Sequence, residues 1–133
     1  MRNIQTKRDI GILIIRVCIG LSMLAFHGIP KISGGLPAWE KIGLAMGNIG
    51  INFLPTFWGF AAALTETLGS LFIILGLWTR PSALLLAFTM LIATITHLIQ
   101  GDGFSVASHS FELLAIFVAL FFTGPGKYSI DKK

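Results

Sequence analysis

The sequence predicts an all-α integral membrane protein, a bundle of four membrane-spanning helices. Two observations lead to this fold class. First, 54% of the 133 residues are hydrophobic and only 12% are charged, whereas soluble domains carry about 25% charged residues. Second, four apolar stretches are each long enough to cross a bilayer, which needs about 20 helical residues. We expect residues 1–133 to form a single domain.

Each of the four predicted spans has a recognisable start. The first follows basic residues, and because it is long and contains Arg16 we expect an uncleaved span rather than a signal peptide. Pro55 and Pro81 fit the first turns of the second and third spans, where a missing N–H costs little. The fourth begins with the polar stretch VASHSFE, which we expect to face protein or water. The predicted spans are residues 10–29, 53–78, 81–99 and 106–123.

The connections between the spans differ in length. Thr79 and Arg80 are expected to form a tight turn between the second and third spans, and residues 101–105 (GDGFS) link the third and fourth. Residues 30–52 carry apolar side chains at helical spacing, which predicts a short amphipathic helix at the outer membrane interface with Trp39 at headgroup depth; an ordered loop is the alternative. These apolar residues are Leu36, Trp39, Ile42, Ala45, Met46 and Ile49.

The distribution of Lys and Arg predicts the orientation in the membrane. Outside the spans, one side carries seven basic residues and the other carries two, and the side richer in Lys and Arg faces the cytoplasm. Both termini are therefore expected to be cytoplasmic, and the net charge of +4 is interpreted as an orientation signal rather than as nucleic-acid binding. The seven are Arg2, Lys7, Arg8, Arg80, Lys127, Lys132 and Lys133, and the two are Lys31 and Lys41.

Several ionisable residues fall inside the predicted spans, where they are costly and normally face the interior of the bundle. Counted at about 1.5 Å per residue, Glu66 and Glu112 lie at one depth, about 17–18 Å from the cytoplasmic end. Arg16 lies about 10 Å deep, and His27 and His97 about 25 Å. The sequence predicts one intramembrane polar cluster, formed by Arg16, His27, Lys31, Glu66, His97, His109 and Glu112.

This cluster has two interpretations. Two carboxylates at one depth need either Arg16 between them or a proton on one of them, and a carboxylate of raised pKa beside histidines suits proton-coupled chemistry. Glu66, Glu112 and His97 are then the candidate catalytic residues. Alternatively, Arg16, Glu66 and Glu112 form an ion-pair network that only fixes the register of the helices.

Metal and haem binding are weaker interpretations. His27 and His97 lie at similar depth on different spans, as two axial haem ligands would. The sequence has no His-x-x-x-His or Cys-x-x-Cys motif, so we predict no metal site and keep haem or metal binding only as an alternative. It also has no phosphate-binding loop or nucleophile elbow.

A series of short motifs runs in a fixed order along nearly the whole chain, and this order resembles the DoxX family of small four-helix membrane proteins. The most specific parts are HG-x-x-K, E-x-x-G-x-x-x-x-x-x-G-x-x-T-R and G-x-G-x-Y-S-x-D. The series is Arg16, FHGIPK (26–31), Gly43, Pro55, TETLGS (65–70), LGLWTRPSA (75–83), His97, Glu112 and GPGKYSID (124–131).

The resemblance implies a multi-pass protein of the bacterial cytoplasmic membrane. The family takes its name from a subunit associated with quinone-linked sulfur oxidation, and other members are linked to redox-stress assemblies. The resemblance lends no catalytic role to the residues that it carries over by position, which are Arg16, His27, Lys31, Glu66, Arg80, His97 and Glu112.

The leading functional hypothesis is a small membrane subunit or accessory of a redox assembly. It would bind a quinone or a similar apolar molecule between the helices, with Glu66, Glu112 and His97 handling protons and Arg16 holding the carboxylates. The second hypothesis is a non-enzymatic scaffold or small-molecule carrier that uses residues 30–52 as its contact surface. The expected partners are the lipid bilayer and either other subunits or further copies of the chain.

Overall fold

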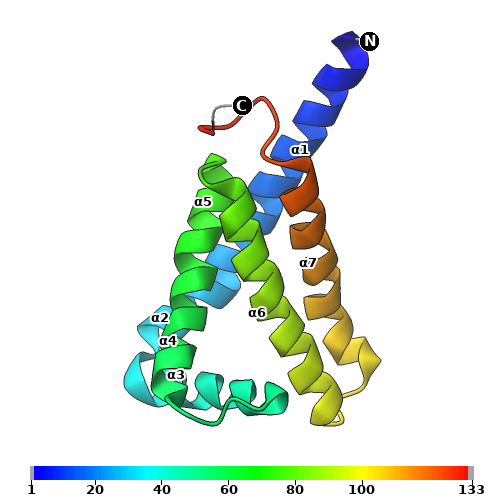
Figure 1. The fold of residues 1–133 in the computed structure, drawn as a ribbon. Helices are drawn as coiled ribbons and strands as arrows, with labels where there is room; N and C mark the ends of the chain where they lie inside the picture. Colours follow the sequence, from blue (N-terminus) through cyan, green and yellow to red (C-terminus); the bar gives the residue numbers. More distant parts are fainter. Residues whose placement is uncertain (1, 132–133) are drawn as a thin grey trace.

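The computed structural model describes residues 2–131, and within that range it is helical without any strand. Four helical segments are long and apolar enough to cross a membrane, which confirms the predicted bundle. Both ends of the described chain lie at one end of the bundle (Figure 1), here called the terminal end; the opposite end is the far end. Lys132, Lys133 and the side chain of Arg2, used for the predicted orientation, lie outside the described part. The segments are Asn3–Ser33, Pro55–Leu75, Thr79–Ile99 and Phe104–Thr123.

The first segment is longer than predicted. It comprises α1 (Arg2–Met23), the π-helical turn η1 (Leu24–Gly28) and α2 (Ile29–Ser33). The polar residues before Ile10 continue the helix beyond the bundle at the terminal end (Figure 1). Pro30 does not end it, because proline is tolerated in the first turn of α2, where no N–H partner is needed.

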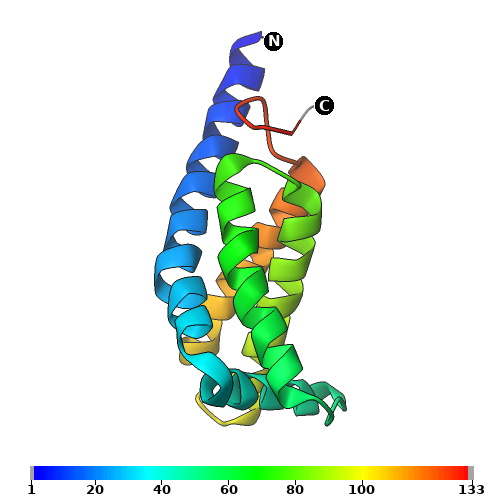
Figure 2. The ribbon, with the colours of Figure 1, turned by 90° about the vertical axis from the view of Figure 1, so that its left-hand side faces the viewer.

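A short helical crosspiece closes the far end. It consists of α3 (Gly35–Gly43) and the 3₁₀ helix η2 (Leu44–Ile49), and it runs across the ends of the long helices (Figure 2). This confirms the predicted helix. Trp39 is turned inward, however, since its Nε1 donates a hydrogen bond to the Lys31 carbonyl at 2.9 Å and its ring packs on Phe60.

Two glycines let the crosspiece touch the second segment backbone to backbone. A Cβ added at Gly43 would lie 1.6 Å from the Pro55 carbonyl oxygen, and one at Gly59 would lie 1.6 Å from the Trp39 carbonyl oxygen. No larger residue fits at either position without moving a helix. The second segment comprises α4 (Pro55–Leu64), the π-helical turn η3 (Thr65–Gly69) and α5 (Ser70–Leu75).

The turn between the second and third segments lies earlier than predicted. α5 ends at Leu75, and the next residue, Gly76, caps it with a φ of +68° that suits glycine. α6 (Thr79–Ile99) begins at Thr79. Thr79 and Arg80 therefore belong to the first turn of α6. Pro81 fits there because the first N–H groups of a helix have no partner within it.

The last helix, α7 (Phe104–Thr123), packs against α6 and is followed by a tail, residues 124–131, that folds back over the terminal end (Figure 1). The buried core joins side chains of all four long segments. Its largest members are Met23, Ile73, Leu86, Met90, Leu113 and Phe117.

Candidate functional site

A cavity of about 690 Å³ lies in the far half of the bundle, between the crosspiece, α4, η3 and α6. Its volume falls within the range of about 300–1,000 Å³ that is typical of small-molecule sites. Most of its wall is apolar, and a few polar side chains lie among the apolar ones. The apolar wall includes Met46, Trp58, Leu85, Phe88 and Ile92, and the polar side chains include Lys31, Glu66, Thr96 and His97.

Glu66 and Lys31 form an ion pair in the wall of this cavity. Lys31 Nζ lies 2.8 Å from Oε1 and 2.7 Å from Oε2 of Glu66. The Glu66 side chain is fully buried, whereas 30% of the Lys31 side chain is exposed. The carboxylate is therefore held inside the bundle by a cation that reaches in from α2, nearer the far end.

Two π-helical turns set the geometry of this pair. η1 carries His27 and precedes Lys31, and η3 carries Glu66. The turns pack closely, because a Cβ added at Gly28 would lie 2.7 Å from the Glu66 carbonyl oxygen and 2.8 Å from the Thr67 Cα. Single π-helical turns within α-helices are rare and occur frequently at functional sites. Gly28 thus brings the first segment close enough for Lys31 to reach Glu66.

Two buried polar atoms of the cavity-lining residues have no hydrogen-bond partner among residues 2–131. They are Nε1 of Trp58, a donor, and Oε2 of Glu66, which lies beside Lys31 but receives no hydrogen bond of acceptable geometry. Buried polar groups are normally satisfied, so each such atom calls for a partner. The residues that line the cavity therefore include one buried donor without a partner, Trp58 Nε1, and one buried carboxylate oxygen, Glu66 Oε2, whose contact is the ammonium of Lys31 at 2.7 Å.

His97 lies near the far end of α6, in the wall of the same cavity. Its Nδ1 is 2.8 Å from Oδ2 of Asp102, and roughly two fifths of each side chain is exposed. The preceding residue, Thr96, accepts a hydrogen bond from Asn48 of the crosspiece, Nδ2 to Oγ1, at 2.8 Å. Of the three candidate catalytic residues, Glu66 and His97 thus line one cavity.

Arg16 does not join these groups. Its guanidinium donates four hydrogen bonds of 2.8–3.0 Å to backbone carbonyls at the terminal end. Of the two alternatives for the carboxylates, the one that places Arg16 between them is wrong, because backbone carbonyls at the end of α5 and in the tail accept hydrogen bonds from four of the five N–H groups of its guanidinium. The four carbonyls belong to Ile73, Ile74, Pro125 and Tyr128.

The tail is fixed at its other end by Asp131. Its carboxylate accepts hydrogen bonds from the N–H groups of Trp78 (2.7 Å) and Thr79 (3.0 Å). Burial opposes the charged form of Asp131, but these hydrogen bonds and the nearby charge of Arg16 outweigh it and hold the pKa of the carboxyl below its usual range. The G-x-G-x-Y-S-x-D motif is thus explained by docking of the tail.

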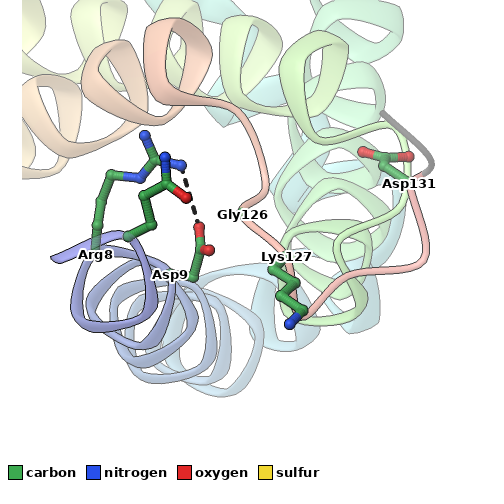
Figure 3. A pocket seen from close by; sticks show the side chains of 6 residues that line it. Arg8, Asp9, Gly126, Lys127 and Asp131 are labelled. Atoms are coloured by element: carbon green, nitrogen blue, oxygen red, sulfur yellow. Dashed lines mark hydrogen bonds and ion pairs between the residues drawn. The ribbon is translucent and has the colours of Figure 1, made fainter. Parts of the chain in front are cut away.

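A second, polar cavity of about 470 Å³ opens at the terminal end, between the first turns of α1 and the tail (Figure 3). Arg8 and Lys127 line it together with Asp9 and Asp131, and Arg8 Nη2 lies 3.4 Å from Asp9 Oδ1. Charged side chains of both signs lie around its rim, so the cavity favours neither anionic nor cationic ligands.

His109 and Glu112 are exposed on the outside of the bundle, so they do not join the predicted polar cluster around Glu66. The inward side of α7 instead carries Ser110, whose Oγ lies 2.9 Å from Thr94 Oγ1. α7 carries apolar side chains on every side, so the shapes of its small and aromatic residues, rather than its polar residues, decide which face packs. The buried residues are Ala107, Ser110, Leu113, Phe117 and Leu120.

The histidines pair differently from the haem hypothesis. His27 Nε2 lies 3.4 Å from His109 Nε2, and the two rings stack, whereas His97 interacts with Asp102. Within residues 2–131, no three side chains of His, Cys, Asp or Glu lie close enough together to hold a metal ion.

Sequence reasoning missed two features of the far-end site. Trp58 is not among the site residues predicted from the sequence, although a tryptophan inside a span brings an N–H that needs a partner. Lys31 was placed in the cluster but not paired with Glu66. The HG-x-x-K spacing is the signal for this pair, since a small residue one turn before a lysine allows the close approach that the pair requires.

Comparisons with known proteins agree with this architecture. The family model described as DoxX matches residues 11–98, which is 88 of the 133 residues. The "Putative oxidoreductase CatD" of Bacillus subtilis (strain 168) is 30% identical over 92% of this chain and 86% of its own length. The "Inner membrane protein YphA" of Escherichia coli (strain K12) is 29% identical over 95% of this chain and 91% of its own length. No solved structure matches the chain significantly. The chain is a multi-pass membrane protein and belongs to the DoxX family.

Proposed function

We propose that this protein is a membrane subunit of a redox assembly and that it binds a quinone-like molecule in the far-half cavity. The observation that carries the proposal is the partly buried Lys31–Glu66 pair in the wall of a mostly apolar cavity of about 690 Å³. The printed name of the Bacillus relative, an oxidoreductase, supports the same class of function. We place the protein in the bacterial cytoplasmic membrane, with the terminal end cytoplasmic.

The polar atoms of the cavity-lining residues match the hydrogen-bonding groups of a quinone head group. A quinone carbonyl accepts hydrogen bonds, and the unused Trp58 Nε1–H and the Lys31 ammonium are donors. A quinol hydroxyl donates, and Glu66 Oε2 is an unused acceptor. Reduction of a quinone by two electrons, delivered by a partner redox subunit, consumes two protons. Glu66 and His97 are the residues of the cavity wall that we assign to proton transfer.

Arg16 and Glu112 take no part in this proposal. Arg16 is fully engaged with carbonyls at the terminal end, and Glu112 is not among the residues that line the cavity. The proton-handling set is therefore smaller than the sequence predicts.

Binding of a short-chain quinone analogue to the purified protein tests the proposal. A ligand that binds only the folded state raises the melting temperature as its concentration exceeds Kd. We expect this rise in the wild type, together with a quinone in organic extracts of the purified protein. Ala62→Phe, which fills the cavity from α4, should abolish the rise, and Ala25→Phe on the exposed surface of η1 is the matched control.

Two outcomes would count against quinone binding. One is a wild-type protein whose melting temperature is the same with and without the analogue and whose extracts contain no quinone. The other is a shift that Ala62→Phe and Ala25→Phe preserve equally, which would place the analogue elsewhere. Extracts that contain another apolar molecule instead would favour the carrier function.

A further inference from the structure

We propose that the outward face of α7 around Glu112 is the contact surface for a second copy of this chain. The starting observation is an exposed carboxylate in the middle of a membrane-spanning helix. Glu112 lies about 12 Å from the far end of α7 and about 16 Å from its terminal end. An ionisable side chain at that depth is costly in lipid and normally finds a polar partner.

Three cations of the membrane-spanning segments have partners other than Glu112. Arg16 is used by four carbonyls, Lys31 by Glu66, and Arg80 by the Phe121 carbonyl. Within residues 2–131, Glu112 itself has no ion pair. A group from a second protomer would therefore satisfy it.

The same face of α7 has the shape of a helix contact. Small residues flank Glu112 at alternating intervals of three and four, the spacing that keeps side chains on one side of a helix in contact with another helix. Small residues at such a seam allow two membrane helices to approach closely. All are exposed except Ser108, which is half-buried; the seam consists of Ser105, Ser108, Glu112, Ala115 and Ala119.

The ionisable groups on this face, Glu112 and His109, can pair between two copies of the chain. His109 is exposed one turn from Glu112, and its Nε2 interacts with His27 Nε2 of the same protomer. In a dimer with its two-fold axis along the membrane normal, the two Glu112 side chains lie at one depth, and His109 of each copy lies one helical turn, about 4.5 Å, nearer the far end. Glu112 of one copy can then reach across to accept a hydrogen bond from His109 of the other, and the contact forms twice. A second copy inserted with the same topology thus presents an imidazole within one turn of each Glu112.

Cysteine cross-linking in native membranes tests this interface. Cys18 is the only cysteine, so the background is Cys18→Ser. We expect Ala115→Cys and Ala119→Cys to give a disulfide-linked dimer on mild oxidation, because seam positions bring the two Cβ atoms to the distance of about 4 Å that a disulfide needs. Leu68→Cys, exposed on η3, is the control and should remain monomeric.

The role of Glu112 is tested in the Ala115→Cys background. Glu112→Leu should remove most of the cross-linked dimer, and Glu112→Gln, which still forms hydrogen bonds, should retain part of it. Melting temperatures of the detergent-purified variants separate loss of the dimer from loss of the fold. Cross-linking at Ala115→Cys no greater than at Leu68→Cys would overturn the proposal. So would a yield that Glu112→Leu leaves unchanged, or a product with the mass of a different partner.

Discussion

Arg16 and Glu66 are the two most completely buried charged side chains of the bundle, and their surroundings are opposite. Arg16 has 1% of its surface exposed and Glu66 has none. The guanidinium of Arg16 meets four carbonyls and closes the terminal end. The carboxylate of Glu66 has one cation, an unused oxygen and a cavity beside it. A fully satisfied buried charge serves the fold, whereas a partly satisfied one beside a cavity is available to a ligand.

The largest expected effect is that of Arg16→Leu, which tests the structural half of this comparison. The substitution leaves the buried carbonyl of Pro125 without its Arg16 donor and that of Ile73 with only the N–H of Gly76, and an unsatisfied buried group costs about 1–3 kcal/mol. We expect a steep drop in melting temperature or no folded protein, measured by thermal unfolding of the detergent-purified protein.

Arg80→Leu is the matched control for Arg16→Leu. Arg80 also belongs to the family motif and also donates to a carbonyl, but it makes a single exposed hydrogen bond to Phe121. Its loss should change the melting temperature little. Equal effects of the two substitutions would mean that burial of Arg16 does not matter.

The next effect concerns the Lys31–Glu66 pair. Lys31→Met leaves the buried carboxylate without its cation, and breaking a buried pair costs about 3–5 kcal/mol. The double variant Lys31→Met/Glu66→Leu removes both charges and should be more stable than Lys31→Met alone, although neither should respond to the quinone analogue. A double variant less stable than both single variants would show that the pair mainly stabilises the fold, and the contrast with Arg16 would disappear.

The helices and the inward faces of the first two segments could be predicted from the sequence. In those segments Arg16, Gly20 and Glu66 share the side that carries small residues, and all three are buried. The face of α7 could not be predicted in the same way. Glu112 aligns with His109 as polar residues of a buried face would, but Ser110 and Phe117 pack better against α6.

The partners of the buried charges were harder to predict than their depth. Depth follows from counting residues, whereas a partner depends on how far a side chain reaches across a helix contact. Lys31 reaches inward to Glu66 because Gly28 brings the helices together, and Arg16 turns toward the terminal end because carbonyls at the end of α5 and in the tail accept its hydrogen bonds there. Neither the close approach at Gly28 nor the position of the carbonyls that bind Arg16 can be seen in the pattern of apolar and polar residues along the sequence.

An intermediate effect is expected for Gly28→Ala, which tests how the Lys31–Glu66 pair is held in place. The new Cβ would lie within 3 Å of the backbone of Glu66 and Thr67, and overpacking of this kind costs about 1–3 kcal/mol. The shift should also separate Lys31 from Glu66 and weaken binding of the quinone analogue. Both quantities can be measured in one series of thermal unfolding experiments.

Gly11→Ala is the control for Gly28→Ala in the same helix. Nothing lies within 4 Å of a Cβ at Gly11, so alanine should stabilise the helix by about 0.5–1 kcal/mol. Opposite signs are therefore expected for the two substitutions. The same sign for both would mean that the two π-helical turns are not packed as closely as the structure indicates.

The smallest expected effect is the pH dependence of tail docking through Asp131. Because the folded state lowers the pKa of this carboxyl, its contribution to stability is fully present above the unfolded pKa of about 3.9. The contribution is lost as the pH falls through the lower, folded pKa. Asp131→Asn cannot titrate, so the difference in melting temperature between wild type and variant should shrink from pH 7 to about pH 3. A difference that stays constant over this range would mean that the carboxylate charge does not hold the tail, which would then depend on Arg16 and on the backbone hydrogen bonds of Ile130 and Asp131.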